Sequence, residues 1–152
     1  MKISIHQINP IIGDFEHNLS LVSEAVRKAS LSGCDLAVFP ELTLMGYPPK
    51  DLLEKPAFIK RNLEYLEKLS KESLNTGIIC GFADINKSEK GKPLINGVAF
   101  LQNGRVICTG GKKLLPSYDV FDETRYFEPA ENSLYIELDN KIIGVTICED
   151  IW

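Results

Sequence analysis

The chain has 152 residues, of which 44% are hydrophobic and 25% charged, and its formal net charge is −4. These values are ordinary for a globular domain and exclude bulk disorder, and the acidic balance argues against a nucleic-acid surface, which requires clustered lysine and arginine. No apolar run approaches the roughly 20 residues of a membrane helix, and the first residues lack a signal-peptide core. We therefore expect one domain or part of one, located in the cytoplasm, with neither membrane nor nucleic acid as a partner.

The first half of the chain alternates between strand and helix patterns. Helices are indicated where apolar residues recur at helical spacing, as Leu19, Val22 and Val26 do, and strands where short apolar runs end at glycine or proline. Pro56 suits the first turn of a helix. In chain order, the expected elements are a strand over residues 2–8, a helix over 18–32, a strand over 36–39, a loop over 41–55, a helix over 56–73 and a strand over 77–82.

The second half of the chain is expected to form hairpins. An exposed loop over residues 86–93 carries charged residues together with glycine and proline. Asn103-Gly104 then separates two strand patterns, which is a strong hairpin signal, and Asp139-Asn140 is a weaker version of it. The hairpin strands are expected over residues 98–102 and 105–109, and over 134–138 and 141–147. Parallel strands under helices followed by antiparallel hairpins predict an α/β or α+β class with a mixed sheet.

Three polar residues follow the ends of three expected strands: Glu41, Lys112 and Cys148. Open α/β sheets bind ligands at the carboxyl ends of their strands, so folding is expected to bring these residues together. An ammonium stabilises a thiolate and an oxyanion, and a carboxylate takes up the thiol proton and later activates water. The three side chains together are therefore suited to cleave an amide through a thioester on Cys148.

Each of these residues also has an ordinary structural explanation. A cysteine after a strand is most often packing, a lone glutamate is usually solvated, and Lys113 beside Lys112 favours a charged surface. Other chemistries fit less well. His6 and His17 are not obvious partners for a cysteine, no cluster has the spacing of metal ligands, and the glycines before Lys112 lack the length of a phosphate-binding loop. We expect the four cysteines to be free thiols.

At these same positions the sequence resembles the nitrilase superfamily. The matching blocks are FPEL at residues 39–42, KxxLP at residues 112–116 and ICEDIW at residues 147–152. The resemblance implies an αββα sandwich, of which residues 1–152 form the N-terminal part, and a Glu-Lys-Cys triad. Cys148 is then the nucleophile, Glu41 the general base and Lys112, chosen over Lys113 by its spacing to the proline, the ammonium.

Two longer blocks are similar to those of glutamine-dependent NAD+ synthetases. Residues 41–53 match ELxLxGYxxxDLL, and residues 115–127 match LPxYxVFDExRYF. The resemblance implies that this domain releases ammonia from glutamine without a cofactor. A separate C-terminal synthetase domain then uses the ammonia, ATP and Mg²⁺ to amidate nicotinic acid adenine dinucleotide.

The same resemblance suggests further site residues. Tyr47 and Tyr118 match tyrosines that line the glutamine site and the ammonia route, although both also suit loop packing. Glu123 matches a second glutamate that supports the triad, and a salt bridge within residues 122–125 explains it equally well. Glu149 matches an acidic residue that positions the nucleophile loop, or is a solvated loop residue.

The resemblance covers about the first half of the family's amidase domain, and the synthetase domain lies outside residues 1–152. We therefore expect a fragment with little or no glutaminase activity by itself, and the family implies a homo-oligomer. Two alternatives remain. One is a stand-alone amidase of the nitrilase superfamily, and the other is an inactive fragment that acts only in assembly.

Overall fold

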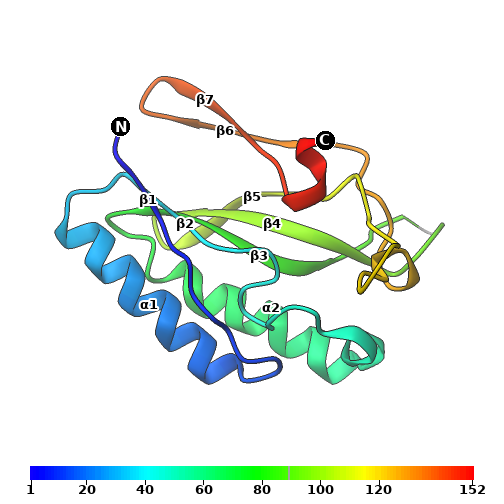
Figure 1. Cartoon of the computed structure of the whole chain (residues 1–152). Helices are drawn as coiled ribbons and strands as arrows, with labels where there is room; N and C mark the ends of the chain where they lie inside the picture. Colours follow the sequence, from blue (N-terminus) through cyan, green and yellow to red (C-terminus); the bar gives the residue numbers. More distant parts are fainter. Residues whose placement is uncertain (89) are drawn as a thin grey trace.

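The computed structural model describes residues 1–88 and 90–152 and shows one mixed sheet between two helices and a hairpin (Figure 1). Strands β1 to β5 are ordered β1-β2-β3-β4-β5. The first three are parallel, and β4 and β5 pair antiparallel. The bounds are β1 Ile3–Ile5, α1 Phe15–Leu31, β2 Leu36–Val38, α2 Pro56–Ser70, β3 Gly77–Ile85, β4 Leu94–Gln102, β5 Arg105–Gly111, β6 Leu134–Leu138 and β7 Lys141–Val145.

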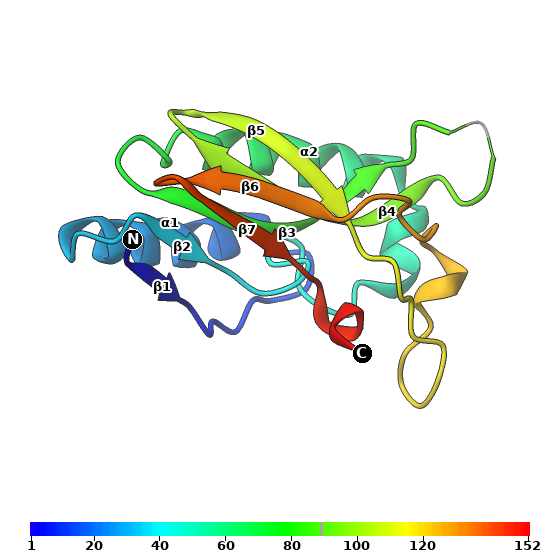
Figure 2. The same cartoon turned by 90° about the horizontal axis from the view of Figure 1, so that it is seen from above.

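The layers follow from the two faces of the sheet. Helices α1 and α2 lie against one face, and the β6–β7 hairpin lies over the other, as Figure 1 and the view in Figure 2 show. The described residues thus form one helical layer and two β layers, which confirms the mixed-sheet α/β class and matches the expected order of a sandwich. None of the described helices combines the length and the apolar character needed to span a membrane.

Helix α1 begins three residues before the expected residue 18. Asp14 precedes it and accepts a hydrogen bond from the backbone nitrogen of His17 at 3.1 Å, which is the geometry of an N-cap. Asn18 is fully buried inside the helix, where its side chain bonds the backbone of Ile11 and Leu44. The expected boundary was wrong because the polar character of Asn18 reflects tertiary hydrogen bonds rather than a helix end.

Several strand lengths also differ from expectation. The first strand covers only Ile3–Ile5 because the chain leaves the sheet after His6, whose backbone nitrogen still bonds the carbonyl of Val38. Strands β3, β4 and β5 are longer than expected, because β3 and β4 pair from Ile78↔Leu101 to Ile85↔Leu94 and β5 stays paired with β4 as far as Gly111. Strand β7 stops at Val145 rather than at residue 147, and α2 stops at Ser70 rather than at residue 73.

The two hairpin turns lie where the sequence predicted them. Asn103 and Gly104 have φ of 54° and 76°, and Asp139 and Asn140 have φ of 52° and 54°. Positive φ at both central residues suits the right-handed twist of the adjoining strands.

The two expected loops differ in content. The loop over 41–55 contains a short 3-10 helix at Lys50–Glu54. The loop expected over 86–93 includes residue 89, which lies outside the described residues, and the remainder has no regular structure.

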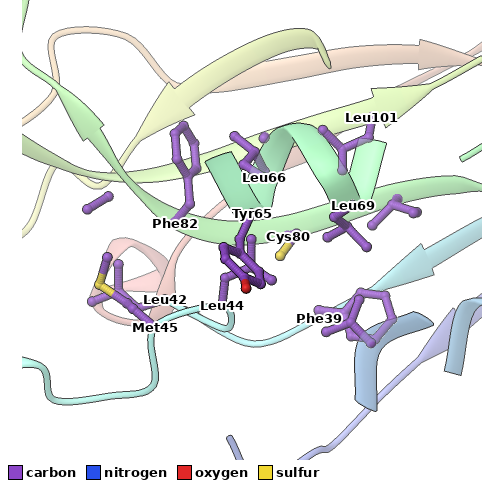
Figure 3. Packing of buried hydrophobic residues seen from close by; sticks show 14 of the residues in the cluster. Phe39, Leu42, Leu44, Met45, Tyr65, Leu66, Leu69, Cys80, Phe82 and Leu101 are labelled. Carbon is purple, nitrogen blue, oxygen red and sulfur yellow. The ribbon is translucent and has the colours of Figure 1, made fainter. Parts of the chain in front are cut away.

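Each face of the sheet has its own hydrophobic core. Alternate residues of β3 face opposite sides, so Cys80 and Phe82 pack with the helices and Ile79 packs under the hairpin. The helix-side core is the larger one, and Figure 3 shows Tyr65, Leu66 and Leu69 of α2 packed over β3. The hairpin-side core contains Leu36, Ile79, Val98, Phe100, Leu134, Ile136 and Ile147.

Candidate functional site

The carboxyl ends of β2 and β5 and the segment after β7 bring the three sequence candidates to one region. Glu41 follows β2 by three residues, Lys112 follows β5 directly, and Cys148 follows β7 by three residues. The backbone of Lys112 is fixed on both sides, because its nitrogen bonds the carbonyl of Asn96 and its carbonyl accepts from the nitrogen of Ala130.

Lys112 is fully buried and lies between two carboxylates. Its Nζ is 2.8 Å from Oε1 of Glu41 and 2.8 Å from Oε1 of Glu123. Lys113, by contrast, is exposed, so Lys112 is the member of the lysine pair that reaches Glu41. An ammonium in this position retains its charge because both partners are anionic acceptors.

Glu123 belongs to the same cluster and is not part of a local salt bridge. Its side chain is buried and accepts hydrogen bonds from Lys112 and, at 2.9 Å, from the hydroxyl of Tyr47. A local salt bridge would have paired Glu123 with Arg125. The guanidinium of Arg125 instead lies 3.3 Å from Oδ1 of Asp51. The structure therefore places both Glu123 and Tyr47 beside the Lys112–Glu41 pair.

Asn96 completes the cluster and was missed in the sequence. It lies on β4, is fully buried, and donates from Nδ2 to Oε1 of Glu41 at 2.5 Å and to Oε2 of Glu123 at 3.0 Å. The only available signal was a polar residue inside an apolar run, and the glycine after it obscured the strand.

A close approach of backbones holds Glu41 against the sheet. A Cβ on Gly81 of β3 would lie 2.4 Å from the backbone nitrogen of Leu42 and 2.8 Å from two backbone atoms of Glu41. Because Gly81 has no side chain, the segment after β2 packs directly on β3. Leu42 itself has a φ of 46°, an uncommon value for a residue other than glycine.

Cys148 begins a short 3-10 helix, Cys148–Ile151, with a φ of 45°. Its thiol is free and exposed, whereas Cys34 and Cys80 are buried. Cys148 and Glu41 line the same cavity of about 110 Å³ beneath the β6–β7 hairpin. Left-handed φ at a residue other than glycine is a strained conformation that often occurs at active sites.

The segment around Cys148 is connected to the segment after Lys112. Oδ1 of Asp150 accepts hydrogen bonds from the backbone nitrogens of Lys113 and Leu114, both at 2.9 Å. The Tyr118 hydroxyl lies 3.0 Å from both carboxylate oxygens of Glu149. Glu149 and Tyr118 thus contact each other at the rim, and neither joins the buried cluster.

The electrostatics of the cluster keep Cys148 protonated. Although Cys148 is an exposed residue, partial burial of its sulfur raises the pKa of the thiol, the charge of Glu41 raises it further, and the opposing effect of Lys112 does not compensate. Burial also raises the pKa of Glu41 above its ordinary value of 4.5, although hydrogen bonds from Lys112 and Asn96 oppose the rise. Burial lowers the pKa of Lys112, but its hydrogen bonds to Glu123 and Glu41 bring it above the ordinary value.

These groups can carry out one kind of chemistry together. A raised pKa makes the Glu41 carboxylate a stronger proton acceptor, which suits proton transfer to it from the neutral thiol of Cys148. The buried ammonium supplies positive charge for an oxyanion. In the described part of the chain, no group of three or more His, Cys, Asp or Glu side chains is arranged to hold a metal ion.

Comparison with known proteins agrees with this geometry. Residues 2–152 match the family model of the carbon-nitrogen hydrolases. A glutamine-dependent NAD(+) synthetase from Thermotoga maritima is 42% identical over the whole chain, which corresponds to 26% of that protein. The chain thus spans about a quarter of the length of the curated relatives it matches.

Two solved structures share the fold. The glutamine-dependent NAD+ synthetase from Acinetobacter baumannii, in complex with ADP, matches with a TM-score of 0.90 and 36% identity, over 99% of this chain and 28% of that one. An amidase from Nesterenkonia sp. matches with a TM-score of 0.81 over 99% of this chain and 56% of that one. Its identity of 19% shows the likeness of the folds alone.

Proposed function

The chain belongs to the carbon-nitrogen hydrolase family, and on that premise we propose that its site hydrolyses the side-chain amide of glutamine through a thioester on Cys148. Glu41 takes the proton from the thiol as the sulfur forms a bond to the amide carbon. The Lys112 ammonium stabilises the negative charge on the oxygen. The carbon–nitrogen bond then breaks, and Glu41 returns the proton to the departing ammonia.

The second half of the reaction uses the same groups. Water gives a proton to Glu41 and attacks the thioester carbon, the carbon–sulfur bond breaks, and the sulfur recovers the proton, which leaves glutamate. In this proposal Glu123 holds Lys112 in place and Tyr47 holds Glu123, in keeping with their hydrogen bonds. Tyr118 and Glu149 lie at the rim and act on substrate entry or ammonia transfer.

One observation supports this proposal above all others. Lys112 is fully buried and paired with Glu41 at 2.8 Å, and Glu41 shares a cavity with the exposed thiol of Cys148. Burying an ammonium and a carboxylate is costly, and a fold rarely does so where an apolar pair would pack as well. A requirement for charge at the reacting atoms explains the cost.

We further propose that the ammonia is passed to an adjoining synthetase domain that amidates nicotinic acid adenine dinucleotide with ATP and Mg²⁺. The support is the name and the 42% identity of the Thermotoga relative. Residues 110–112 do not suit the phosphates of ATP, because the Lys112 amine is already bound by two carboxylates. The proposal therefore places ATP outside residues 1–152.

The main alternative is a stand-alone amidase. It rests on the Nesterenkonia structure, which supports the fold but, at 19% identity, no substrate. An inactive assembly module, the other alternative, does not explain the buried charges. The synthetase-linked glutaminase and the stand-alone amidase differ in what becomes of the ammonia. Only the first incorporates the glutamine nitrogen into a dinucleotide.

The test uses Cys148→Ala in the protein together with the sequence that naturally adjoins residues 1–152. We expect the variant to lose glutamine-dependent NAD+ formation by at least about 1,000-fold, because the nucleophile is removed. It should retain formation supported by free ammonium, since that route bypasses the thiol. The measurement is transfer of ¹⁵N from amide-labelled glutamine, compared with ¹⁵N-ammonium.

Cys108→Ala is the matched control, because Cys108 is a half-buried free thiol on strand β5 and takes no part in the hydrogen bonds of the Glu41–Lys112 pair. It should keep both activities. Ammonia release from glutamine without transfer to the dinucleotide would favour the stand-alone amidase. Full glutamine-dependent activity in Cys148→Ala would refute the proposed chemistry.

A further inference from the structure

One amide group connects the two carboxylates of the site, in addition to the ammonium of Lys112. Asn96 donates from Nδ2 to Oε1 of Glu41 at 2.5 Å and to Oε2 of Glu123 at 3.0 Å. Glu41 and Glu123 are thus bridged twice, once by the ammonium of Lys112 and once by the neutral amide of Asn96. With one positive and two negative charges, the cluster has an anionic excess that neutral donors must stabilise.

The two ends of the Asn96 amide differ in their hydrogen bonding. Oδ1 of Asn96 is buried and has no hydrogen-bond partner among the described residues. A buried polar atom without a partner destabilises a fold, so the donor end of this amide, and not its acceptor end, accounts for an asparagine here. Ionised carboxylates only accept hydrogen bonds, so they fix the amide with Nδ2 toward Glu41 and Glu123.

The two donors leave the oxygens of Glu41 unequal. Oε1 of Glu41 accepts from both Lys112 and Asn96, whereas Oε2 has no hydrogen bond within the described part of the chain. Glu41 lines the cavity that also contains Cys148. An oxygen without donors is the stronger proton acceptor, since its lone pairs are not engaged.

We propose that Asn96 is a positioning residue that anchors Oε1 of Glu41, so that Oε2 is presented to Cys148 as the proton acceptor. The inference deepens the proposed amidase function and rests on it. Asn96 touches neither the thiol nor the departing group, and it acts through Glu41.

The charges around Glu41 determine what a change at Asn96 does. Glu41 faces the Lys112 ammonium, the Glu123 carboxylate and the Cys148 thiol, and Tyr47 joins the group through Glu123. Asn96→Asp keeps the shape of the side chain but replaces a donor with a third negative charge. Glu41 then holds its proton more tightly, so a higher pH is required to form the base.

The experiment uses the protein together with the sequence that naturally adjoins residues 1–152, and compares the pH profiles of glutamine hydrolysis for Asn96→Asp and Asn96→Ser with that of the unmodified protein. The acid limb of kcat/KM should move to higher pH in Asn96→Asp. At neutral pH its kcat should fall about 100-fold, and KM should change much less, because the base and not the substrate contact is affected. Asn96→Ser retains one donor, so we expect about a 10-fold fall in kcat and a smaller shift of the acid limb. If Asn96→Asp folds poorly, Asn96→Ser provides the same test.

Asn62→Asp is the matched control. Asn62 is also fully buried and donates from Nδ2, at 2.7 Å, but its acceptor is the backbone carbonyl of Ala83. This change should lower the melting temperature and leave the acid limb in place, as a purely structural effect does. An unmoved acid limb in both folded Asn96 variants overturns the positioning role.

A second readout separates this inference from the proposed function. The pH dependence of Cys148 alkylation by iodoacetamide requires no substrate, and in Asn96→Asp it should shift to higher pH. If the unmodified protein fails to hydrolyse glutamine but this shift occurs, the proposed substrate is wrong and the positioning role stands. If hydrolysis occurs and neither the alkylation nor the acid limb moves, the positioning role is wrong.

Discussion

The folded surroundings of Glu41 favour its protonated form, whereas the proposed mechanism requires the ionised form. Its side chain is largely buried beside a second carboxylate, and these surroundings raise its pKa above 4.5, although the Lys112 ammonium opposes the rise. The folded protein therefore binds this proton more tightly than the unfolded chain does. Ionisation of Glu41, which the proposed mechanism requires, costs stability as the pH rises from 4.5 through the raised pKa.

Glu41→Gln should reveal this cost. The glutamine keeps the shape of the protonated acid and cannot ionise, so the variant should match the unmodified protein near about pH 4 and melt at a higher temperature near about pH 8. Activity should be lost at every pH. Thermal unfolding across that range measures the difference. A variant that melts lower at neutral pH would show that the ion pair with Lys112 outweighs burial.

The sequence indicated which polar residues follow the strand ends, but it did not indicate all of the side chains that they contact. Glu41, Lys112 and Cys148 follow strand ends and lie in family-like blocks, so both position and motif indicated them. Asn96 lies inside a strand and outside the blocks that resemble the nitrilase superfamily. Its role depends on the register of β4 beside β5, which places its carbonyl against Lys112 and its side chain between two glutamates. Register of this kind is a tertiary property that local patterns do not encode.

Strand β3 shapes the site through a residue without a side chain. Gly81 lies where the backbone after β2 crosses the sheet, and a Cβ there would overlap the backbone of Glu41 and Leu42. Gly81→Ala should therefore displace Glu41, reduce glutamine hydrolysis and destabilise the fold by about 1–3 kcal/mol. Activity assays and urea unfolding measure the two effects.

Gly144→Ala is the control for this change. Gly144 also lies in a strand, but a Cβ there would be no closer than 3.5 Å to the side chain of Tyr135, which is ordinary contact. We expect nearly unchanged activity and stability. Equal effects of the two substitutions would mean that replacing any strand glycine lowers activity and stability. The close approach of the Glu41 backbone to Gly81 would then not be the cause.

Element types were more predictable than element ends. The two hairpin turns were predicted because positive φ is favourable for asparagine, aspartate and glycine, which is a local preference. The start of α1 was misplaced because Asp14 caps the helix while Asn18 is used for tertiary bonds. The first strand was overestimated because apolar alternation continues after the chain has left the sheet.

The whole molecule depends on two cores that share one sheet. The hairpin-side core is the smaller, and it holds the layer from which Cys148 extends. Ile136 is buried there, whereas the adjacent Tyr135 is 68% exposed on the outer face of the same strand. The two residues therefore form a matched pair that tests how the hairpin is attached.

Ile136→Ala should destabilise the protein by about 2–5 kcal/mol, because it leaves a cavity between hairpin and sheet. Tyr135→Ala should cost less than about 0.5 kcal/mol in this chain. Urea unfolding gives the two free energies. Faster proteolysis of residues 134–145 should accompany the first change only. A larger cost for Tyr135→Ala would mean that the outer face of the hairpin is covered in solution.

The arrangement of the layers also sets the order in which the site becomes complete. The acid and the amine belong to the central sheet and its loops, whereas the sulfur arrives with the last hairpin of the described chain. During synthesis the earlier segments emerge from the ribosome first and begin to fold first. A nascent chain therefore holds its proton acceptor and its cation before it has a nucleophile to activate, and the sulfur joins them only when the β6–β7 hairpin docks.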